Sequence, residues 1–390
     1  MKHRRPVLAH LTTTDITLEL LLGPQLTAFA EAGYEVIALS APGPYVDRIE
    51  ARGVRFIPMR HASRAGASAR DLRAAKEAYD TFRGVRPDIV HTHNPKPGVY
   101  GRIAARAARV PVVVNTVHGL YAQADDPLPR RLAVYALERL AATCSQAELV
   151  QNPEDVETLA RLGVPRARLH QLGNGIDLDR FDPHRLAPKR CAALRAEMGA
   201  GPGDVVCGAV GRLVWEKGYR ELFEAAARLR RTRPELRIVV VGERDAEKQD
   251  ALSQAEISRA EQEGGVCFLG HRDDVDELYG AFDMYVLASH REGFPRSAME
   301  AAAMGLPVVA TNIRGCRQVV DPGRTGVLVP SHDVDALTAA IDELAGDPQH
   351  RAALACAARA RALHEFDQHR IIDTTLGVYD QLLGRARSCS

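Results

Sequence analysis

The sequence has none of the long apolar runs that carry a chain across a membrane, because no stretch approaches the roughly 18 residues required. Its basic start, MKHRRPVLAHL, continues directly into a strand-like segment and lacks the apolar core and cleavage site of a secretory signal. The seven cysteines are scattered and form no Cys-x-x-Cys pair, which argues against a disulfide framework and a zinc ribbon. We therefore expect a cytoplasmic protein.

Two common nucleotide-binding motifs are also missing. No Gly-x-Gly-x-x-Gly follows the first predicted strand, which counts against a dinucleotide-dependent dehydrogenase. The glycines near Lys217 have the wrong spacing for a P-loop, and no serine or threonine follows this lysine. Any nucleotide site in this chain must therefore be built from other residues.

Strong charge of one sign is absent as well, since the net charge is +1 with 26% charged and 46% hydrophobic residues. This is the composition of a soluble globular protein, and 390 residues are enough for two domains. The positive excess lies in the part of the chain that ends at Arg185. It indicates an anionic partner, such as a membrane surface or a pyrophosphate, or is ordinary charge scatter.

Short runs of valine, isoleucine and leucine alternate with longer amphipathic stretches, which is typical of parallel sheets covered by helices. The pattern fills residues 1–185, restarts near residue 200 after a joint rich in proline, glycine and charge, and ends in a helix after residue 366. We predict an α/β protein with domains 1–185 and 200–365 and a terminal helix, 366–390. The predicted strands are 7–11, 35–39, 55–58, 89–92, 112–116, 149–151, 205–210, 237–241, 266–269, 284–287, 308–311 and 326–329, and the predicted helices include 18–32, 71–83, 98–109 and 131–142.

Residues 289–307, SHREGFPRSAMEAAAMGLP, form the most informative stretch. Glu292 falls in a turn, and Glu300 falls on an alanine-rich helix that Pro295 would begin, since its fixed φ suits the first helical position. The N–H groups of residues 294–297 would then point at an anion. A carboxylate beside an anion site suits a ligand with hydroxyls and phosphates, such as a sugar nucleotide. The alternative is a solvated acidic turn before an ordinary amphipathic helix.

This stretch resembles the E-x7-E signature of the retaining GT-B glycosyltransferases of family 4. The resemblance implies two Rossmann-like domains that face each other across a cleft, with the terminal helix crossing back to the first domain. It assigns acceptor binding to domain 1–185 and nucleotide-sugar binding to domain 200–365. It also implies retention of configuration without a metal ion or cofactor. Within the signature, Glu300 would hold the ribose hydroxyls, and the donor sugar would meet Glu292, Gly293, Phe294, Pro295 and Arg296.

Other motifs in the second half match the same family. Gly211-Arg212-Leu-Val-Trp-Glu-Lys217-Gly resembles its G-R-L-x-x-x-K-G segment. Arg212 offers a planar fork and Lys217 a point charge, and both suit a diphosphate whose charge grows as it leaves. The alternative is a solvated helix start. The resemblance places Arg272 beside the nucleotide base, where backbone groups act.

The first predicted strand ends in Leu-Thr-Thr-Thr-Asp, where family members often carry a glycine pair. Thr14 could replace those glycines as a hydrogen-bonding group toward donor phosphate, while Asp15 is expected to cap a helix. Further along, the Asn-Gly turn before Asp177 matches a family segment that precedes the linker. We interpret its Asp-x-Asp pair as turn chemistry rather than a metal site.

Histidines end two other predicted strands of the first half. The sequence His-Thr-His93-Asn-Pro-Lys96 resembles a loop of transferases that act on polyprenyl-diphosphate-linked sugars, which implies that Lys96 and His93 meet the acceptor. His91 and His93 share a strand face, so a metal pair is the alternative, although no third ligand is visible. In the family, a histidine placed like His118 hydrogen-bonds the donor sugar near the reacting carbon, whereas a satisfied core histidine is the plain alternative.

We therefore predict a cytoplasmic retaining hexosyltransferase, with peripheral contact at the inner face of the membrane as a further option. Its donor would be a UDP-sugar, with GDP-mannose still open, and its acceptor a lipid-linked or envelope glycan. We expect no metal, no cofactor beyond the nucleotide-sugar co-substrate, and no nucleic-acid partner. The alternatives are a transferase for small molecules in natural-product or thiol-sugar synthesis, a non-hydrolysing sugar-nucleotide epimerase, and a non-catalytic sugar-nucleotide sensor.

Overall fold

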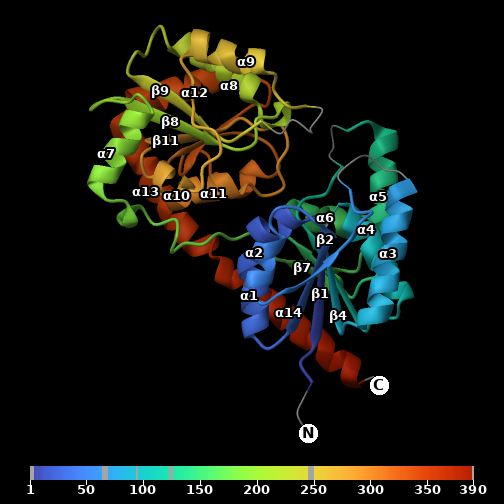
Figure 1. The fold of residues 1–390 in the computed structure, drawn as a ribbon. Helices are drawn as coiled ribbons and strands as arrows, with labels where there is room; N and C mark the ends of the chain where they lie inside the picture. The colour runs from blue at the N-terminus through green and yellow to red at the C-terminus, as the bar shows by residue number, and fades with distance from the viewer. Residues whose placement is uncertain (1–3, 64–68, 94, 123–125, 245–249, 389–390) are drawn as a thin grey trace. The chain divides into compact units, whose positions relative to one another are not determined.

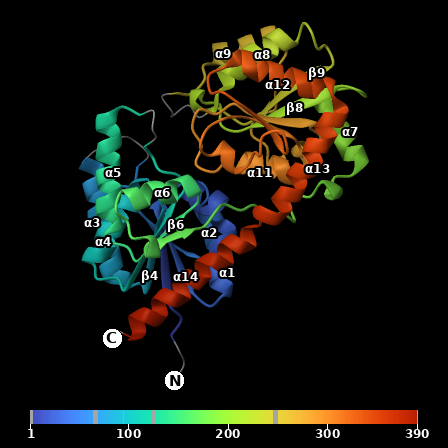
Figure 2. The ribbon, with the colours of Figure 1, turned by 180° about the vertical axis from the view of Figure 1, so that it is seen from behind.

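The computed structural model describes residues 4–63, 69–93, 95–122, 126–244 and 250–388. The chain divides into two compact units: unit 1 comprises Met1–Gly173 and His369–Ser390, and unit 2 comprises Asn174–Gln368. Each unit is built on one parallel β-sheet with helices packed against it (Figures 1 and 2). The predicted α/β class is confirmed. Within the described residues, no helix combines the length and apolar character needed to cross a bilayer.

The sheet of unit 1 has seven strands in the order β3-β2-β1-β4-β5-β6-β7. The chain winds one way from β1 to β3 and the other way from β4 onward, so the β1–β4 neighbourhood is a topological switch point. Ligands of such sheets bind beyond the carboxyl ends of the strands at this point. The strands are β1 (Val7–Thr14), β2 (Glu35–Ala41), β3 (Arg55–Pro58), β4 (Ile89–His93), β5 (Val112–Val117), β6 (Ala147–Val150) and β7 (Leu169–Gln171).

Successive residues of these strands pack into opposite cores, because side chains alternate between the two faces of a sheet. In β1, Leu8 joins the core that includes α1 and α14, whereas Ala9 joins the core that includes α3 and α4. The helices of unit 1 are α1 (Gly23–Glu31), α2 (Val46–Ala51), α3 (Ala69–Val85), α4 (Lys96–Ala107), α5 (Leu128–Ala142), α6 (Pro153–Arg161) and most of α14 (Gln368–Ser388).

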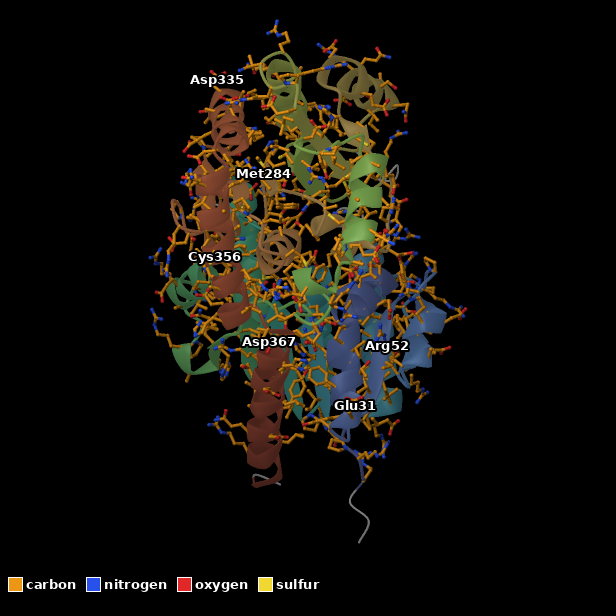
Figure 3. All side chains as sticks on the ribbon, turned by 90° about the vertical axis from the view of Figure 1, so that its left-hand side faces the viewer. Glu31, Arg52, Met284, Asp335, Cys356 and Asp367 are labelled. Carbon is orange, nitrogen blue, oxygen red and sulfur yellow. The ribbon has the colours of Figure 1, made fainter. Side chains whose placement is uncertain are left out.

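The last helix, α14, completes the core of unit 1 although the sequence of unit 2 precedes it. Ile371, Ile372 and Tyr379 are buried in that core, and the Tyr379 hydroxyl contacts His91 of β4. Within unit 2, Ile176 forms a parallel bridge with Asp367, so the outgoing and returning segments of the chain lie side by side. Figure 3 labels Asp367 just before the chain enters α14.

Unit 2 has a six-stranded sheet in the order β10-β9-β8-β11-β12-β13, with its switch point between β8 and β11. Val206 and Val239 face the core with α7, α10, α11 and α13, and Cys207 and Val240 face the core with α8, α9 and α12. The strands are β8 (Val205–Val210), β9 (Leu236–Val241), β10 (Cys267–Phe268), β11 (Met284–Leu287), β12 (Val308–Thr311) and β13 (Gly326–Val329); the helices are α7 (Pro188–Glu197), α8 (Tyr219–Leu229), α9 (Gln254–Arg259), α10 (Val275–Tyr279), α11 (Arg296–Ala303), α12 (Val334–Gly346) and α13 (Pro348–Glu365).

All twelve predicted strands are present, with shifts of a few residues at their ends. The predicted joint is where the sequence misled us, because the unit boundary falls after Gly173 and residues 174–203 belong to unit 2. Leu194 and Met198 anchor α7 in the core of unit 2, so this stretch is structured rather than a linker. The predicted helix 18–32 is also interrupted: a π-helical turn, Thr17–Leu21, precedes α1, in whose first turn Pro24 stands.

Candidate active site

Two loops that follow neighbouring strands of unit 2 meet through an ion pair between two predicted site residues. Lys217 follows β8, Glu292 follows β11, and the Lys217 ammonium donates to a Glu292 carboxylate oxygen at 2.6 Å. The side chains are 23% and 13% exposed, so both groups are accessible from one side only. The sequence assigned these residues to different parts of a ligand, and the structure brings them into direct contact.

Glycines allow these loops to approach so closely. Gly218 has φ +69°, and a Cβ there would lie 1.9 Å from the carbonyl oxygen of Ala288. A Cβ on Gly315 would lie 2.6 Å from the carbonyl oxygen of Glu292. A Cβ on Gly242 would lie 2.0 Å from the carbonyl oxygen of Gly211. A side chain at any of these positions would displace the loops that hold the ion pair.

Glu300 on α11 is a largely buried carboxylate, 14% exposed, whose hydrogen-bonding capacity is only partly used by the described residues. The Tyr279 hydroxyl lies 3.2 Å from one carboxylate oxygen, and the Arg296 guanidinium lies 3.9 Å from the other. Burial raises the pKa of Glu300 above its usual range, against the lowering effect of Arg296. A carboxylate accepts about four hydrogen bonds, so Glu300 can accept from a ligand that brings hydroxyl donors.

The turn before α11 is fixed by residues that the sequence analysis did not single out. Pro295 is the residue before the helix rather than its first residue, and it supplies no side-chain cap to the first turn. The Asn174 side-chain amide donates to the Phe294 carbonyl at 3.1 Å. The Phe294 ring packs edge-on against Phe366, with ring centres 6.2 Å apart. Phe294 therefore acts through its backbone and as a packing anchor.

A partly buried polar group, formed by Glu221, His290 and His332, supports the same loop at the residues before Glu292. One oxygen of Glu221 accepts from His290 Nε2 at 2.8 Å and from His332 Nδ1 at 3.1 Å. Burial raises the pKa of Glu221, but the hydrogen bonds from the two histidines outweigh it and lower the pKa to about 2. His290 lies two residues before Glu292, so this group helps to position it. No spacing in the sequence linked these three residues.

The predicted arginines differ in what their side chains can do. Arg272 donates to Asp274 at 2.7 Å and also contacts Glu197, and these partners hold its pKa above the ordinary value. Its side chain is therefore engaged, and any role beside a ligand falls to its backbone. Arg212 is exposed in the turn after β8. Asp177, the turn residue, accepts from the backbone N–H groups of Asp179 and Arg180, which confirms its predicted turn chemistry.

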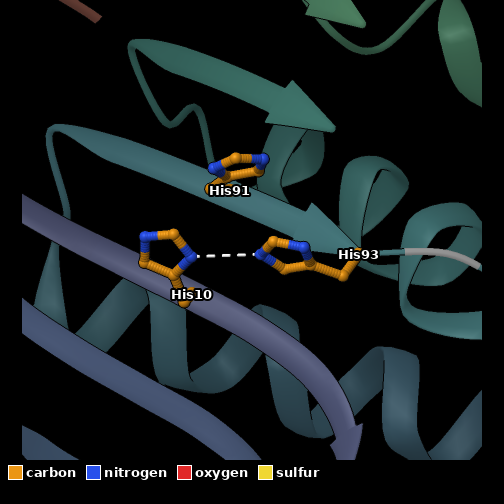
Figure 4. Close-up of side chains that lie close together, drawn as sticks. All are labelled: His10, His91 and His93. Carbon is orange, nitrogen blue, oxygen red and sulfur yellow. Dashed lines mark hydrogen bonds between the residues drawn. The ribbon is translucent and has the colours of Figure 1, made fainter. Parts of the chain in front are cut away.

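In unit 1, a hydrogen-bonded chain joins the buried His10 of β1 and His93 of β4 to the partly buried His118, which follows β5. His10 Nδ1 lies 3.1 Å from His93 Nε2, and His93 Nδ1 lies 3.0 Å from His118 Nε2. Figure 4 shows the contact between His10 and His93. Burial lowers the pKa of His10 to about 3 and that of His118 to about 4, so the rings are neutral at pH 7.

Because each neutral ring carries one N–H, the tautomers of this chain are coupled. If His10 donates to His93, then His93 donates to His118, and the remaining N–H of His118 is on Nδ1. The opposite arrangement would leave a buried N–H on His10 Nε2, which has no hydrogen-bond partner among the described residues. The two end nitrogens of the chain, His10 Nε2 and His118 Nδ1, are both buried. Burial therefore does not select one arrangement over the other, and His118 donates through Nδ1 in one of them and through Nε2 in the other.

The structure corrects the prediction that His93 binds an acceptor, because its ring is 2% exposed and both nitrogens face other histidines. His10 supplies the third histidine that a metal pair lacked. However, His91 directs its two nitrogens at the hydroxyls of Tyr379 and Thr116. It therefore presents no lone pair to the other two rings, and the cluster fits hydrogen bonding better than metal ligation.

Two other predicted residues of unit 1 have local partners. The Lys96 ammonium at the start of α4 donates to Asp71 at 2.9 Å, with 21% of its side chain exposed. The Thr14 hydroxyl lies 3.3 Å from that of Thr17 at the end of β1. Asp15 was wrongly expected to cap a helix: its carboxylate accepts from the backbone N–H groups of Ile16 and Tyr45 and so fixes the loop after β2.

Comparisons with known proteins show which family the chain resembles. Residues 193–361 match the model "Glycosyl transferases group 1", and residues 23–175 match the "Glycosyl transferase 4-like domain". The chain is 31% identical over 281 residues, 71% of each chain, to the UDP-Gal:alpha-D-GlcNAc-diphosphoundecaprenol alpha-1,3-galactosyltransferase of Escherichia coli. It is 30% identical over 384 residues to a glycogen synthase of Mycobacterium tuberculosis (strain ATCC 25618 / H37Rv), covering 90% of this chain and 88% of the relative.

Solved structures show the same fold. The crystal structure of Anabaena Alr3699/HepE in complex with UDP and glucose superposes with a TM-score of 0.78 at 22% identity. The match covers 97% of this chain and 99% of the other. Two parallel-sheet α/β units and this likeness establish the GT-B fold.

Proposed function

Because the chain belongs to the group 1 glycosyltransferases, enzymes of the GT-B fold that use nucleotide-sugar donors, we propose that it transfers a hexose from a UDP-sugar to a hydroxyl group of a lipid-linked or envelope glycan, with retention of configuration. The observation that carries the donor assignment is Glu300. A largely buried carboxylate with spare acceptor capacity suits the two hydroxyls of a ribose. We place the enzyme in the cytoplasm, in peripheral contact with the membrane.

The Lys217–Glu292 ion pair suggests how the donor diphosphate is bound. In the ligand-free structure each charge neutralises the other. A diphosphate offers Lys217 a stronger anionic partner, and Glu292 is then released to accept from a hydroxyl of the donor sugar. The Gly293–Pro295 backbone and Arg296 directly follow Glu292 in the chain. This exchange would couple diphosphate binding to sugar binding.

Positive charge at this site would stabilise the leaving group. The diphosphate gains charge as the glycosidic bond breaks, and Lys217, Arg212 and the N–H groups at the start of α11 would stabilise that charge. We therefore propose that the reaction needs neither a metal ion nor a further cofactor. The acceptor hydroxyl would attack from the face that the diphosphate leaves, and a phosphate oxygen would take its proton.

In unit 1 we assign His118 a hydrogen bond to the donor sugar, which it would donate through Nδ1 when His10 donates to His93 and His93 to His118. Thr14 remains a proposed donor contact. Lys96 would exchange Asp71 for the diphosphate of a lipid-linked acceptor. The Escherichia coli relative, whose name specifies a diphosphoundecaprenol acceptor, supports this acceptor class.

Thermal unfolding with UDP, GDP and ADP tests the donor site. A ligand at 100 times its Kd should stabilise the protein by about 2.7 kcal/mol. We expect UDP to give this shift, Glu300→Gln to remove it, and the exposed control Glu261→Gln to retain it. A shift with GDP instead would reassign the base, and no shift with any nucleotide would refute the proposed donor site.

A transfer assay tests the acceptor. Radiolabelled UDP-sugars would be offered with a polyprenyl-diphosphate-linked sugar, with glycogen and with small-molecule alcohols. Product on the lipid, with an acceptor KM that rises in Lys96→Ala, would support the proposal. Product only on glycogen or on a small molecule would refute the lipid-linked acceptor and leave the donor assignment intact. An unchanged acceptor KM in Lys96→Ala would refute the role of this lysine.

A further inference from the structure

Helix α5 of unit 1 exposes an unusual number of leucines. Leu128, Leu132, Leu137 and Leu140 are 55%, 58%, 51% and 57% exposed, and Tyr121, just before the helix, is 51% exposed. In the described parts of the chain eleven large hydrophobic side chains are exposed, and these five account for nearly half of them. Exposed apolar residues scattered singly are normal, whereas a contiguous group marks an interaction surface.

The helical period places these leucines on the outer side of α5. At about 100° per residue, Leu128, Leu132 and Leu140 fall within one third of the helix circumference with Ala136 among them, Ala133 lies just beyond Leu140, and Leu137 lies about 60° beyond Leu140. The opposite side carries the buried residues Glu138, Ala141 and Ala142. The helix is therefore apolar on the face that it turns to solvent, the reverse of an ordinary surface helix.

The charges of α5 are sorted as sharply as its apolar residues. Its single acidic residue, Glu138, points inward and accepts from the buried Arg102 guanidinium at 2.6 Å. Its three basic residues, Arg130, Arg131 and Arg139, are all at least partly exposed. Arg130 also lies over the Tyr121 ring, with its guanidinium carbon 5.3 Å from the ring centre. By the helical period Arg139 lies among the leucines and Arg130 lies beside Leu137, whereas Arg131 falls on the side of the buried residues. Arg130 also pairs with the buried Asp126 at 3.3 Å. The leucine side of the helix thus carries Arg130 and Arg139 and no carboxylate of α5.

We propose that this face, defined by Tyr121, Leu128, Leu132, Leu137, Leu140, Arg130 and Arg139, docks on the surface of an anionic lipid bilayer. The leucines would enter the boundary between headgroups and acyl chains while the arginines meet lipid phosphates, as interfacial helices do. The proposal rests on the proposed function, because an enzyme with a lipid-linked acceptor must meet that acceptor at a membrane.

Charge selects the bilayer over a second copy of the chain. In a symmetric dimer the same patch meets itself, so the arginines of one α5 would face those of the other without an intervening carboxylate from this helix. An anionic membrane supplies the complementary charge and an apolar layer together.

Flotation of the full chain with lipid vesicles tests the surface. We expect binding to vesicles of equal parts phosphatidylglycerol and phosphatidylcholine, little binding to pure phosphatidylcholine, and weaker binding at high salt. The double variant Leu132→Glu/Leu140→Glu should bind the anionic vesicles about tenfold less or worse. The matched control is Leu363→Glu, because Leu363 is 50% exposed on α13 of unit 2.

Two parallel measurements separate the outcomes. UDP-induced stabilisation of each variant, without vesicles, reports folding and the donor site. If the double variant keeps that stabilisation and still binds vesicles like the parent, the membrane surface is refuted while the proposed function stands. If vesicles bind as expected but no nucleotide stabilises the chain, the proposed function fails and the surface remains. Ultracentrifugation that shows dimers, lost in the double variant, would assign the patch to a second copy and overturn the proposal.

Discussion

Replacement of Arg102 by methionine should destabilise unit 1 strongly and in a pH-dependent way. The guanidinium is fully buried and donates to Glu138 of α5 at 2.6 Å and to Glu148 of β6 at 2.8 Å. Asn115 and Ser145 also donate to Glu148. Burial raises the pKa of the Glu148 carboxyl, against the lowering effect of Arg102. Without the guanidinium, two carboxylates remain close together in a region of low polarity.

The expected cost can be estimated in two ways. Removal of one partner from a buried ionic group costs about 3 to 5 kcal/mol. Alternatively, one carboxyl takes up a proton, and with an unfolded-state pKa near 4.3 this costs about 3.7 kcal/mol at pH 7 and about 1 kcal/mol at pH 5. A carboxyl whose folded pKa is raised stabilises the protein below its unfolded pKa and loses that contribution as the pH rises. The deficit of the variant should therefore shrink by about 2.7 kcal/mol between pH 7 and pH 5.

Urea unfolding of the parent and of Arg102→Met at both pH values measures this deficit. Arg106→Met is the matched control, because Arg106 is exposed on the same helix, and it should change stability by less than about 0.5 kcal/mol. Adding Glu138→Gln to the Arg102 variant should restore much of the loss at pH 7. A deficit below about 1 kcal/mol at pH 7, or one that does not change with pH, would refute the view that Arg102 neutralises two buried carboxylates.

Three further predictions concern other parts of the fold. Gly199→Ala should lower the free energy of unfolding by about 1 kcal/mol, for its positive φ alone. Gly218→Ala should lower it by about 1 to 3 kcal/mol more, because the added Cβ would lie 1.9 Å from a main-chain oxygen. Equal losses for the two variants in urea unfolding would contradict this. Tyr379→Phe removes the hydroxyl partner of a buried histidine and should cost about 1 to 3 kcal/mol by the same assay. His10 and His118 have folded pKa values of about 3 and about 4; because only the unfolded state binds their protons below pH 6.5, each should lower stability by about 1.4 kcal/mol per pH unit as the pH falls from 6.5 to 4. His10→Phe should remove the contribution of one histidine, about 1.4 kcal/mol per pH unit, from the slope of stability against pH. An unchanged slope would show that His10 is not buried in its neutral form.

The sequence predicts the sheets well because valine-rich runs bounded by polar turns have few other structures open to them. The strands from 55–58 and 205–210 end at the predicted residues. Two short elements, β7 with three residues and α2 with six, were not among the predicted ones, because so few residues show no clear periodicity. The segment around α7 looked like a linker, since only the contacts of Leu194 and Met198 show that it has a core to join.

The same distinction between local patterns and distant contacts holds for the candidate site. The motif that contains Glu292 and Glu300 is local in sequence, so its turn and helix could be predicted. The contact of Lys217 with Glu292 joins residues 75 positions apart, and that of His10 with His93 joins residues 83 apart. Such pairs depend on which strands are neighbours, and a pattern of residue types does not specify strand order. For this reason the sequence suggested that His93 faces a ligand, whereas it faces another histidine.

The placement of α14 has a consequence for how the protein is made. The core of unit 1 includes Ile371, Ile372 and Leu383, which are the last part of that unit to leave the ribosome. Unit 2 is continuous from Asn174 to Gln368 and can fold as soon as it is synthesised. At about 5 to 20 residues per second, unit 1 waits about 10 to 40 s after Gly173 with part of one face of its sheet, the part that α14 covers, still exposed. During that interval the nascent chain exposes the apolar surface that chaperones bind, so the later unit is expected to reach its native state first.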